Sequence, residues 1–205
     1  LLNVLEERDA QIRGYKVRLP LDVMLIASAN PEDYTNRGRI ITPLKDRFGS
    51  QIRTHYPLEI ETEMEIAENE AVPMAVPGIE ATMPEFMNEI VTTFSHIARA
   101  SPQVNQRSGV SVRMTITNYE TLIANATRRA LQRGESRVVP RVSDLEAMMA
   151  STAGKVEIES IEEGRDGLIV TNMIKAAVLE VFKNRFSPED LADVVHSFDS
   201  GTVVH

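Results

Sequence analysis

The stretch VMLIASANP at positions 23–31 decides the expected fold. Its first seven residues form a nearly continuous apolar run, which is typical of a strand buried on both faces of a parallel sheet. Asn30 and Pro31 end the run sharply, because Asn-Pro favours a turn. In open α/β sheets, ligands bind at the carboxyl ends of the strands, and the amide of Asn30 could both donate and accept hydrogen bonds there. The alternative is that Asn30 only starts the turn.

Shorter patterns surround this predicted strand. Residues 1–9 carry leucines on one side, like the end of an amphipathic helix, so we expect the sequence to begin inside a larger protein. Residues 11–19 alternate in polarity around Gly14 and predict a β-hairpin. A second strand is predicted around 51–56. Together these patterns predict the last part of an α/β sheet.

From residue 59 onward, apolar residues recur every three or four positions, which is the spacing of amphipathic helices. Ser111 is a predicted N-cap, and Gly134 follows the end of the same helix. Residues 72–84 hold three prolines and one glycine and are the best linker candidate. Helices are predicted at 59–71, 84–98, 111–133, from 143, at 169–182 and at 187–198, whereas residues 154–167 fit a strand or a loop.

The predicted fold class is therefore mostly α, in three parts. Residues 1–72 would supply the last strands of an α/β sheet, residues 73–154 a helical domain, and residues 155–205 a C-terminal helical extension. A chain of 205 residues is long enough to bury a real core in such domains.

The composition narrows the classes of partner. The net charge is −8, with nine Lys or Arg against seven Asp or Glu in residues 1–55 and an acidic balance afterwards. Nucleic acid is therefore not expected as a partner, because binding it requires a clustered positive face. No apolar run approaches the roughly 20 residues of a membrane span, so no membrane partner is expected. The absence of cysteine excludes disulfides and thiolate metal sites.

Two groups of residues that could have bound a metal ion do not have the right pattern. The six glutamates of residues 59–71 are spread around the predicted helix, which is typical of a solvated face. The four histidines have no ligand-like spacing. No metal site is therefore predicted.

Two arginines could bind a small anion such as a phosphate. Arg47 lies in LKDRF at positions 44–48, and an arginine on a short structured segment can bind a phosphate through two parallel hydrogen bonds. Arg113 lies in the first turn of a predicted helix, where a cation costs about 0.3–1 kcal/mol against the helix dipole and a nearby anion would reverse that cost. The alternatives are a solvated arginine at both positions, or an acidic neighbour paired with Arg47.

Together, VMLIASANP and LKDRF resemble the sensor-1 strand and the arginine-finger segment of AAA+ ATPases. The closer resemblance is to the ATPase subunit of magnesium chelatase and to MoxR-type proteins, in which a helix and a β-hairpin precede the sensor-1 strand. Downstream, SVR at 111–113, the helix ending near Gly134 and the pattern V-x-P-x-x-x-D at 138–144 look like the sensor-2 helix and lid. The resemblance covers about residues 1–154.

This resemblance implies a role for each candidate residue. Asn30 would be sensor 1 and orient the attacking water near the γ-phosphate. Arg47 would be the arginine finger, which reaches the nucleotide of the neighbouring subunit and stabilises transition-state charge. Arg113 would be sensor 2 and close the lid over the phosphates of its own subunit, while Asp46 would help to orient the finger.

The sequence departs from the family in lacking the phosphate-binding loop G-x-x-x-x-G-K-[ST] and an apolar strand that ends in Asp-Glu. ATP and Mg²⁺ would therefore be bound mainly by residues upstream, and these 205 residues alone are expected to be inactive. The resemblance implies a cytoplasmic ATP hydrolase that forms a ring, a hexamer, and acts on a partner or substrate protein or assists metal insertion.

Two other functions remain open. The chain could belong to a non-catalytic scaffold derived from the same fold, and an intact upstream phosphate loop would argue against that. It could also belong to a transcription-activator ATPase, which the acidic balance and the lack of a recognisable helix-turn-helix disfavour.

Overall fold

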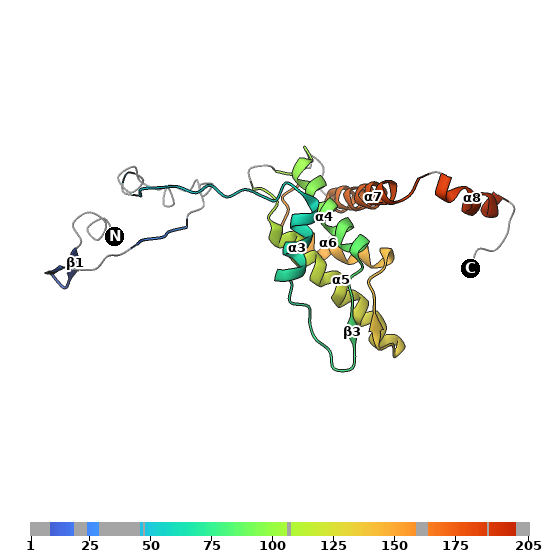
Figure 1. The fold of residues 1–205 in the computed structure, drawn as a ribbon, viewed down its shortest axis with the longest axis horizontal. Helices are drawn as coiled ribbons and strands as arrows, with labels where there is room; N and C mark the ends of the chain where they lie inside the picture. Colours follow the sequence, from blue (N-terminus) through green and yellow to red (C-terminus); the bar gives the residue numbers. More distant parts are fainter. Residues whose placement is uncertain are drawn as a thin grey trace. The chain divides into compact units, whose positions relative to one another are not determined.

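Helices dominate the part of the chain that the computed structural model describes, namely residues 9–18, 24–28, 46, 48–105, 108–158, 164–187 and 189–199. This confirms the mostly α fold class. The chain divides into two compact units, Leu1–His55 and Tyr56–His205, and the ribbon in Figure 1 follows them from blue to red.

The first unit contains the predicted β-hairpin. Strand β1 (Asp9–Ile12) pairs antiparallel with β2 (Tyr15–Arg18), and Ile12 lies opposite Tyr15. The two loop residues, Arg13 and Gly14, have φ angles of 51° and 87°. Two consecutive positive φ angles are what a type I′ turn requires, and its twist matches that of the paired strands. The hairpin prediction is therefore confirmed.

The two other predicted strands do not form in the described residues. Residues 24–28 and 51–56 have no regular secondary structure. Met24 and Ile26 are 85% and 83% exposed, and Ile52 is 90% exposed, so these apolar side chains are not covered. A strand requires a neighbouring strand to pair with its backbone groups, and among the described residues neither segment has one.

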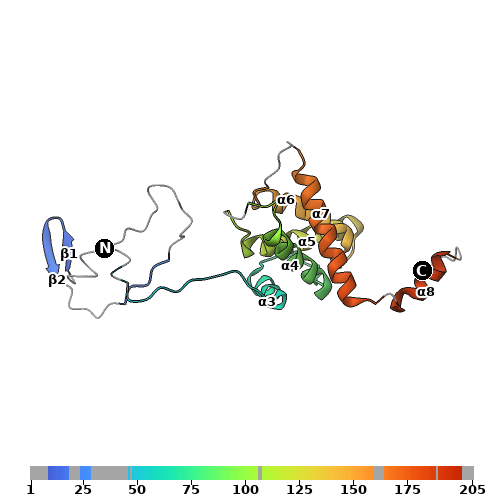
Figure 2. The same cartoon turned by 90° about the horizontal axis from the view of Figure 1, so that it is seen from above.

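The second unit consists of helices joined by short segments. Its elements are α3 (Ile60–Glu70), β3 (Glu80–Ala81), α4 (Glu85–Ala100), α5 (Val112–Arg133), β4 (Arg137–Val138), the 3₁₀ helix η1 (Val142–Ala147), α6 (Met148–Ala153), α7 (Asp166–Arg185), the 3₁₀ helix η2 (Glu189–Leu191) and α8 (Ala192–Asp199). Figure 2 shows α7 running across α4, α5 and α6.

The ends of α5 follow the predicted capping rules. The Ser111 side chain accepts a hydrogen bond from the backbone N–H of Arg113, and Gly134 ends the helix in the left-handed region with a φ of 70°. The helix predicted from residue 143 begins differently. The chain winds there as η1, and Asp144 accepts a hydrogen bond from the backbone N–H of Arg141 at 2.8 Å.

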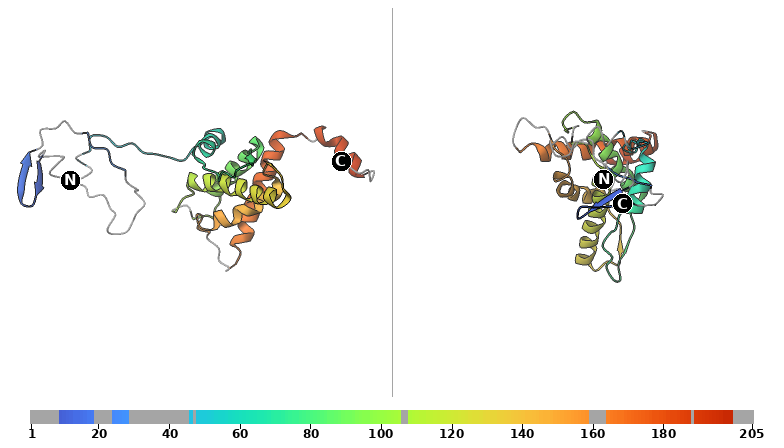
Figure 3. Two further views of the ribbon diagram at one scale, coloured as in Figure 1. Left: turned by 90° about the horizontal axis from the view of Figure 1, so that it is seen from below. Right: turned by 90° about the vertical axis from the view of Figure 1, so that its left-hand side faces the viewer.

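The predicted linker at 72–84 contains a short strand. β3 pairs in parallel with β4, so Glu80 lies beside Arg137 and Ala81 beside Val138. Figure 3 shows this pair beside the C-terminal end of α5 in its right-hand view. The linker is therefore tied to the segment that follows α5.

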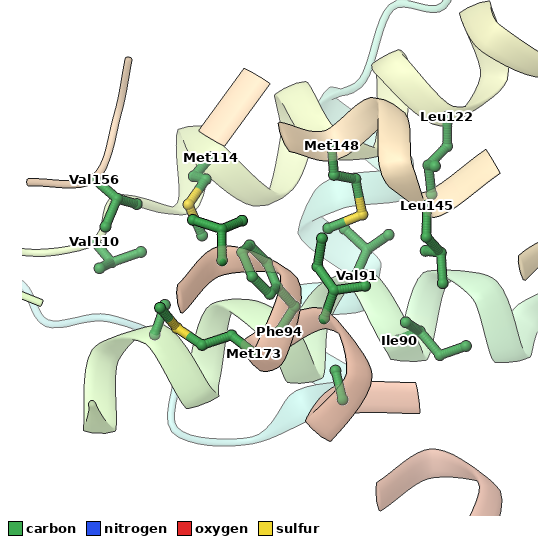
Figure 4. Packing of buried hydrophobic residues seen from close by; sticks show 14 of the residues in the cluster. Ile90, Val91, Phe94, Val110, Met114, Leu122, Leu145, Met148, Val156 and Met173 are labelled. Carbon is green, nitrogen blue, oxygen red and sulfur yellow. The ribbon is translucent and has the colours of Figure 1, made fainter. Parts of the chain in front are cut away.

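The main core forms around α4, which packs against α3, α5 and α7. Phe94, Met87 and Leu122 are fully buried in it, and Figure 4 shows how the neighbouring side chains interlock. Val156 and the inner face of α7 belong to the same core cluster. The compact units thus differ from the predicted boundaries at 72 and 154, because α3 and α7 both pack with the helices between them.

Candidate functional site

The start of α5 carries Arg113, which the structure describes, whereas Asn30 and Arg47 lie outside the described residues. Arg113 lies in the first turn and is exposed, while the next two residues, Met114 and Thr115, are fully buried. Within the described part of the chain, no carboxylate forms an ion pair with the guanidinium of Arg113. The first turn therefore presents a cation to solvent on one side and anchors the helix on the other.

A buried carboxylate lies beneath this turn. Glu63 of α3 is 0% exposed. Arg99 of α4 donates two parallel hydrogen bonds to it, from Nη1 to Oε2 at 2.5 Å and from Nη2 to Oε1 at 2.7 Å. The hydroxyl of Thr115 in α5 donates to Oε1, and His96 Nε2 lies 3.1 Å from Oε2. One carboxylate thus joins three helices.

These contacts determine the ionisation of Glu63. Burial by itself raises its pKa, because it penalises the charged form. The hydrogen bonds from Arg99 and Thr115, together with the charges of Arg99 and His96, outweigh burial and hold the pKa of Glu63 below its ordinary value. Each oxygen has two partners, so the four lone-pair directions are all used. Glu63 is therefore a positioning residue and not available as a base or a metal ligand.

Arg99 connects this buried pair to the residues just before α5. Its Nε donates to the backbone carbonyl of Val110 at 2.9 Å, and its guanidinium lies 4.9 Å from the centre of the Tyr56 ring. Gly109 has a φ of 67°, and a Cβ there would lie 2.6 Å from the Tyr56 hydroxyl. The chain entering α5 is therefore held on both sides.

A second buried carboxylate fixes the other end of the helical unit. Asp144 of η1 is 4% exposed and accepts hydrogen bonds from Arg129 Nη2 at 2.8 Å and Asn125 Nδ2 at 2.9 Å. Both donors lie on α5. The segment after β4, which carries the lid-like sequence pattern, is therefore tied to the C-terminal half of α5.

The structure describes only part of the predicted site. Asn30 and Arg47 lie outside the described residues, and Asp46 is exposed. Only Arg113 is placed, where the sequence predicted it, in a capped first helical turn.

The sequence reasoning missed Glu63. Five of the six glutamates at 59–71 are exposed, as predicted for a solvated face, but Glu63 is buried. The signal was present in the spacing, because Glu63 falls on the same helical stripe as Ile60, Ala67 and Ala71. Its partners Arg99 and His96 are separated by three positions on α4, so they share one face.

The described residues contain no group of three or more histidine or acidic side chains that could hold a metal ion. None of the helices in the described part combines the length and the apolar composition needed to cross a bilayer. Comparison with family models, with curated proteins and with solved structures gave no match to this chain.

Proposed function

We propose that the chain is the sensor and lid part of a ring-forming AAA+ ATPase of the magnesium-chelatase or MoxR type, which couples ATP hydrolysis to remodelling of a partner or to metal insertion. The order of the sequence motifs supports this proposal. The structural observation that favours it most is Arg113, an exposed arginine without an ion-pair partner in the described residues, at the capped start of α5.

This arrangement fits a phosphate. A cation and the positive end of the helix dipole both favour an anion at the same place. The contacts of Glu63 and Arg99 fix the start of α5 before any ligand binds, so little ordering would be required on binding. Mg²⁺ bound with ATP would neutralise phosphate charge, and its ligands would lie upstream in this proposal.

In the same proposal, Asn30 orients the attacking water. Arg47 stabilises the charge on the nucleotide of the neighbouring subunit, while Arg113 contacts the nucleotide of its own subunit. Arg113 therefore serves mainly nucleotide binding and Arg47 mainly turnover, because an arginine finger acts mainly on the transition state.

The first prediction concerns Arg113 in the ATPase that contains this chain. Arg113→Ala should weaken nucleotide binding by about 10- to 100-fold, the effect of losing a hydrogen bond between charged groups. Titration with a fluorescent ATP analogue measures this directly.

Arg133→Ala is the matched control, because Arg133 is also exposed and lies in the last turn of the same helix. The control should bind nucleotide like the wild type. Equal affinities for the Arg113→Ala variant and the wild type would contradict the sensor-2 role.

The second prediction concerns residues 1–205 alone. ATP should bind them only in the millimolar range or more weakly, because the phosphate-binding loop absent from this sequence supplies most backbone donors to the phosphates. Isothermal titration calorimetry is the measurement. A micromolar dissociation constant would show that the chain is a sufficient nucleotide-binding module and would overturn this part of the proposal.

A further inference from the structure

An uncovered apolar groove follows the C-terminal half of α7. It comprises two adjoining hollows of about 600 Å³ and 270 Å³, and both are lined by Val142, Val178 and Phe182. Phe182 is 43% exposed, and the neighbouring Leu179 and Phe186 are 52% and 47% exposed. Adjoining exposed apolar side chains of this size mark a surface that another element covers. We call these lining and flanking residues the α7 groove.

A second apolar helical face lies just beyond this groove in the sequence. Leu191, Val195 and Phe198 recur at the spacing of one helical face across η2 and α8. Val195 is 56% exposed. Segment 189–199 is therefore amphipathic, and its apolar face includes an exposed side chain.

The connection between the two surfaces is short. α7 ends at Arg185 and η2 begins at Glu189, so three residues separate them. Loops of two to five residues typically join antiparallel helices that pack side by side. In such a hairpin, positions equally far from the turn lie beside each other, so Val195 would lie near Leu179.

Charge favours the same arrangement. Residues 189–199 contain four acidic residues and no lysine or arginine. The α7 groove is lined by Lys175, and Lys183 lies on the same half of α7, whereas Arg185 is already paired with Glu89 at 2.6 Å. In the hairpin register, position 199 falls beside position 175, which pairs an aspartate with a lysine.

We propose that segment 189–199 of the same chain folds back as a helical hairpin and covers the α7 groove. This proposal does not depend on ATPase activity. Its occupant is the chain's own C-terminal helix, because the loop length, the apolar register and the charges all fit that segment.

The distance between two spin labels tests the proposal on the full chain. The sequence contains no cysteine, so cysteines introduced by Asn172→Cys and His196→Cys are the only labelling sites. Both positions are exposed. A folded hairpin separates these backbone positions by about 13 Å, given about 9 Å between helix axes and about 9 Å along them from the rise per residue. A continuous extended arrangement separates them by about 36 Å.

Val195→Asp in α8 and Phe182→Asp in α7 should each shift the distance distribution to the longer value. Leu168→Asp is the control, because Leu168 is 58% exposed on α7 but does not line the groove. It should leave the short distance unchanged. Circular dichroism verifies that each variant keeps its helices, and Val195→Asp leaves the helical core untouched.

Dilution with unlabelled chain distinguishes the segment of the same chain from that of a second copy. The short distance should persist on dilution. A short distance that disappears would overturn the proposal in favour of exchange between copies. A long distance in the labelled chain without further substitutions would also overturn it. So would a short distance that persists in both the Val195→Asp and the Phe182→Asp variants.

Discussion

Arg47→Ala is expected to lower ATP turnover by about 10³- to 10⁵-fold in the ATPase that contains this chain, while nucleotide affinity stays nearly unchanged. The reason is that an arginine finger stabilises negative charge that develops mainly in the transition state. Steady-state ATPase rates and nucleotide titration on the same preparation separate the two effects.

Arg53→Ala is a suitable control, because Arg53 is exposed and follows Arg47 closely in the sequence. It should hydrolyse ATP like the wild type. If Arg47→Ala also turned over at the wild-type rate, the finger assignment would be wrong, and Arg37 or Arg39 would be the next candidate.

Mixing two inactive variants tests whether Arg47 acts across a subunit boundary. In rings built from Asn30→Ala and Arg47→Ala subunits, about a quarter of the head-to-tail interfaces combine an intact Asn30 with a neighbour's intact Arg47. Partial ATPase activity should therefore return, unless the ring requires every site to be active. No recovery, in rings shown to be mixed by native mass spectrometry, would count against a finger that acts in trans.

The second large effect concerns the buried pair of Glu63 and Arg99. Arg99→Met should lower the free energy of unfolding by about 3–5 kcal/mol, the usual cost of leaving a buried charge without its partner. Glu63 has no access to solvent, so it cannot recover its hydration. Urea denaturation followed by circular dichroism measures the change.

A double variant separates the pair from the packing around it. Replacing both partners, as in Glu63→Leu with Arg99→Met, removes the unpaired charge and should recover much of the loss seen in Arg99→Met alone. Glu65→Gln is the control on α3, because Glu65 is exposed, and it should change stability by less than about 0.5 kcal/mol. A small effect of Arg99→Met, below about 1 kcal/mol, would show that the pair is not structurally important.

The same pair predicts a dependence of stability on pH. The pKa of Glu63 is lower in the folded chain than its ordinary value, so the folded state favours the ionised form. Its contribution is therefore fully present above the ordinary glutamate pKa of about 4.3 and is lost as the pH falls through the folded value. Relative to the wild type, Glu63→Gln should lose this part of the acid sensitivity. An identical change of unfolding free energy with pH in both proteins would contradict the assignment.

Local signals explain which elements could be predicted. The hairpin at β1 and β2 depends on an alternating pattern and a two-residue turn, and α5 depends on Ser111 and Gly134 at its ends. Each of these signals lies within a few residues of the turn or helix end that it predicts. The apolar run at 23–29 is different, because a buried strand also requires neighbours, and the described part of that run has none.

The candidate site was predicted less completely, for a related reason. The position of Arg113 in a first helical turn followed from its own neighbours. The burial of Glu63 depends on Arg99 and Thr115, which lie on other helices 36 and 52 positions further along the chain. A single helix of acidic residues therefore looks fully solvated until its packing partners are known.

The close approach of Tyr56 to Gly109 has a consequence for sequence variation among relatives of this chain. A Cβ at position 109 would overlap the tyrosine hydroxyl at 2.6 Å, so a larger residue there would displace the ring that lies over Arg99. A smaller side chain at position 56 would remove the overlap. The positive φ at position 109 would remain, and glycine adopts it without strain, while asparagine tolerates it. Positions 56 and 109 should therefore vary together, with glycine or asparagine at 109 and a bulky aromatic at 56 only where 109 is glycine.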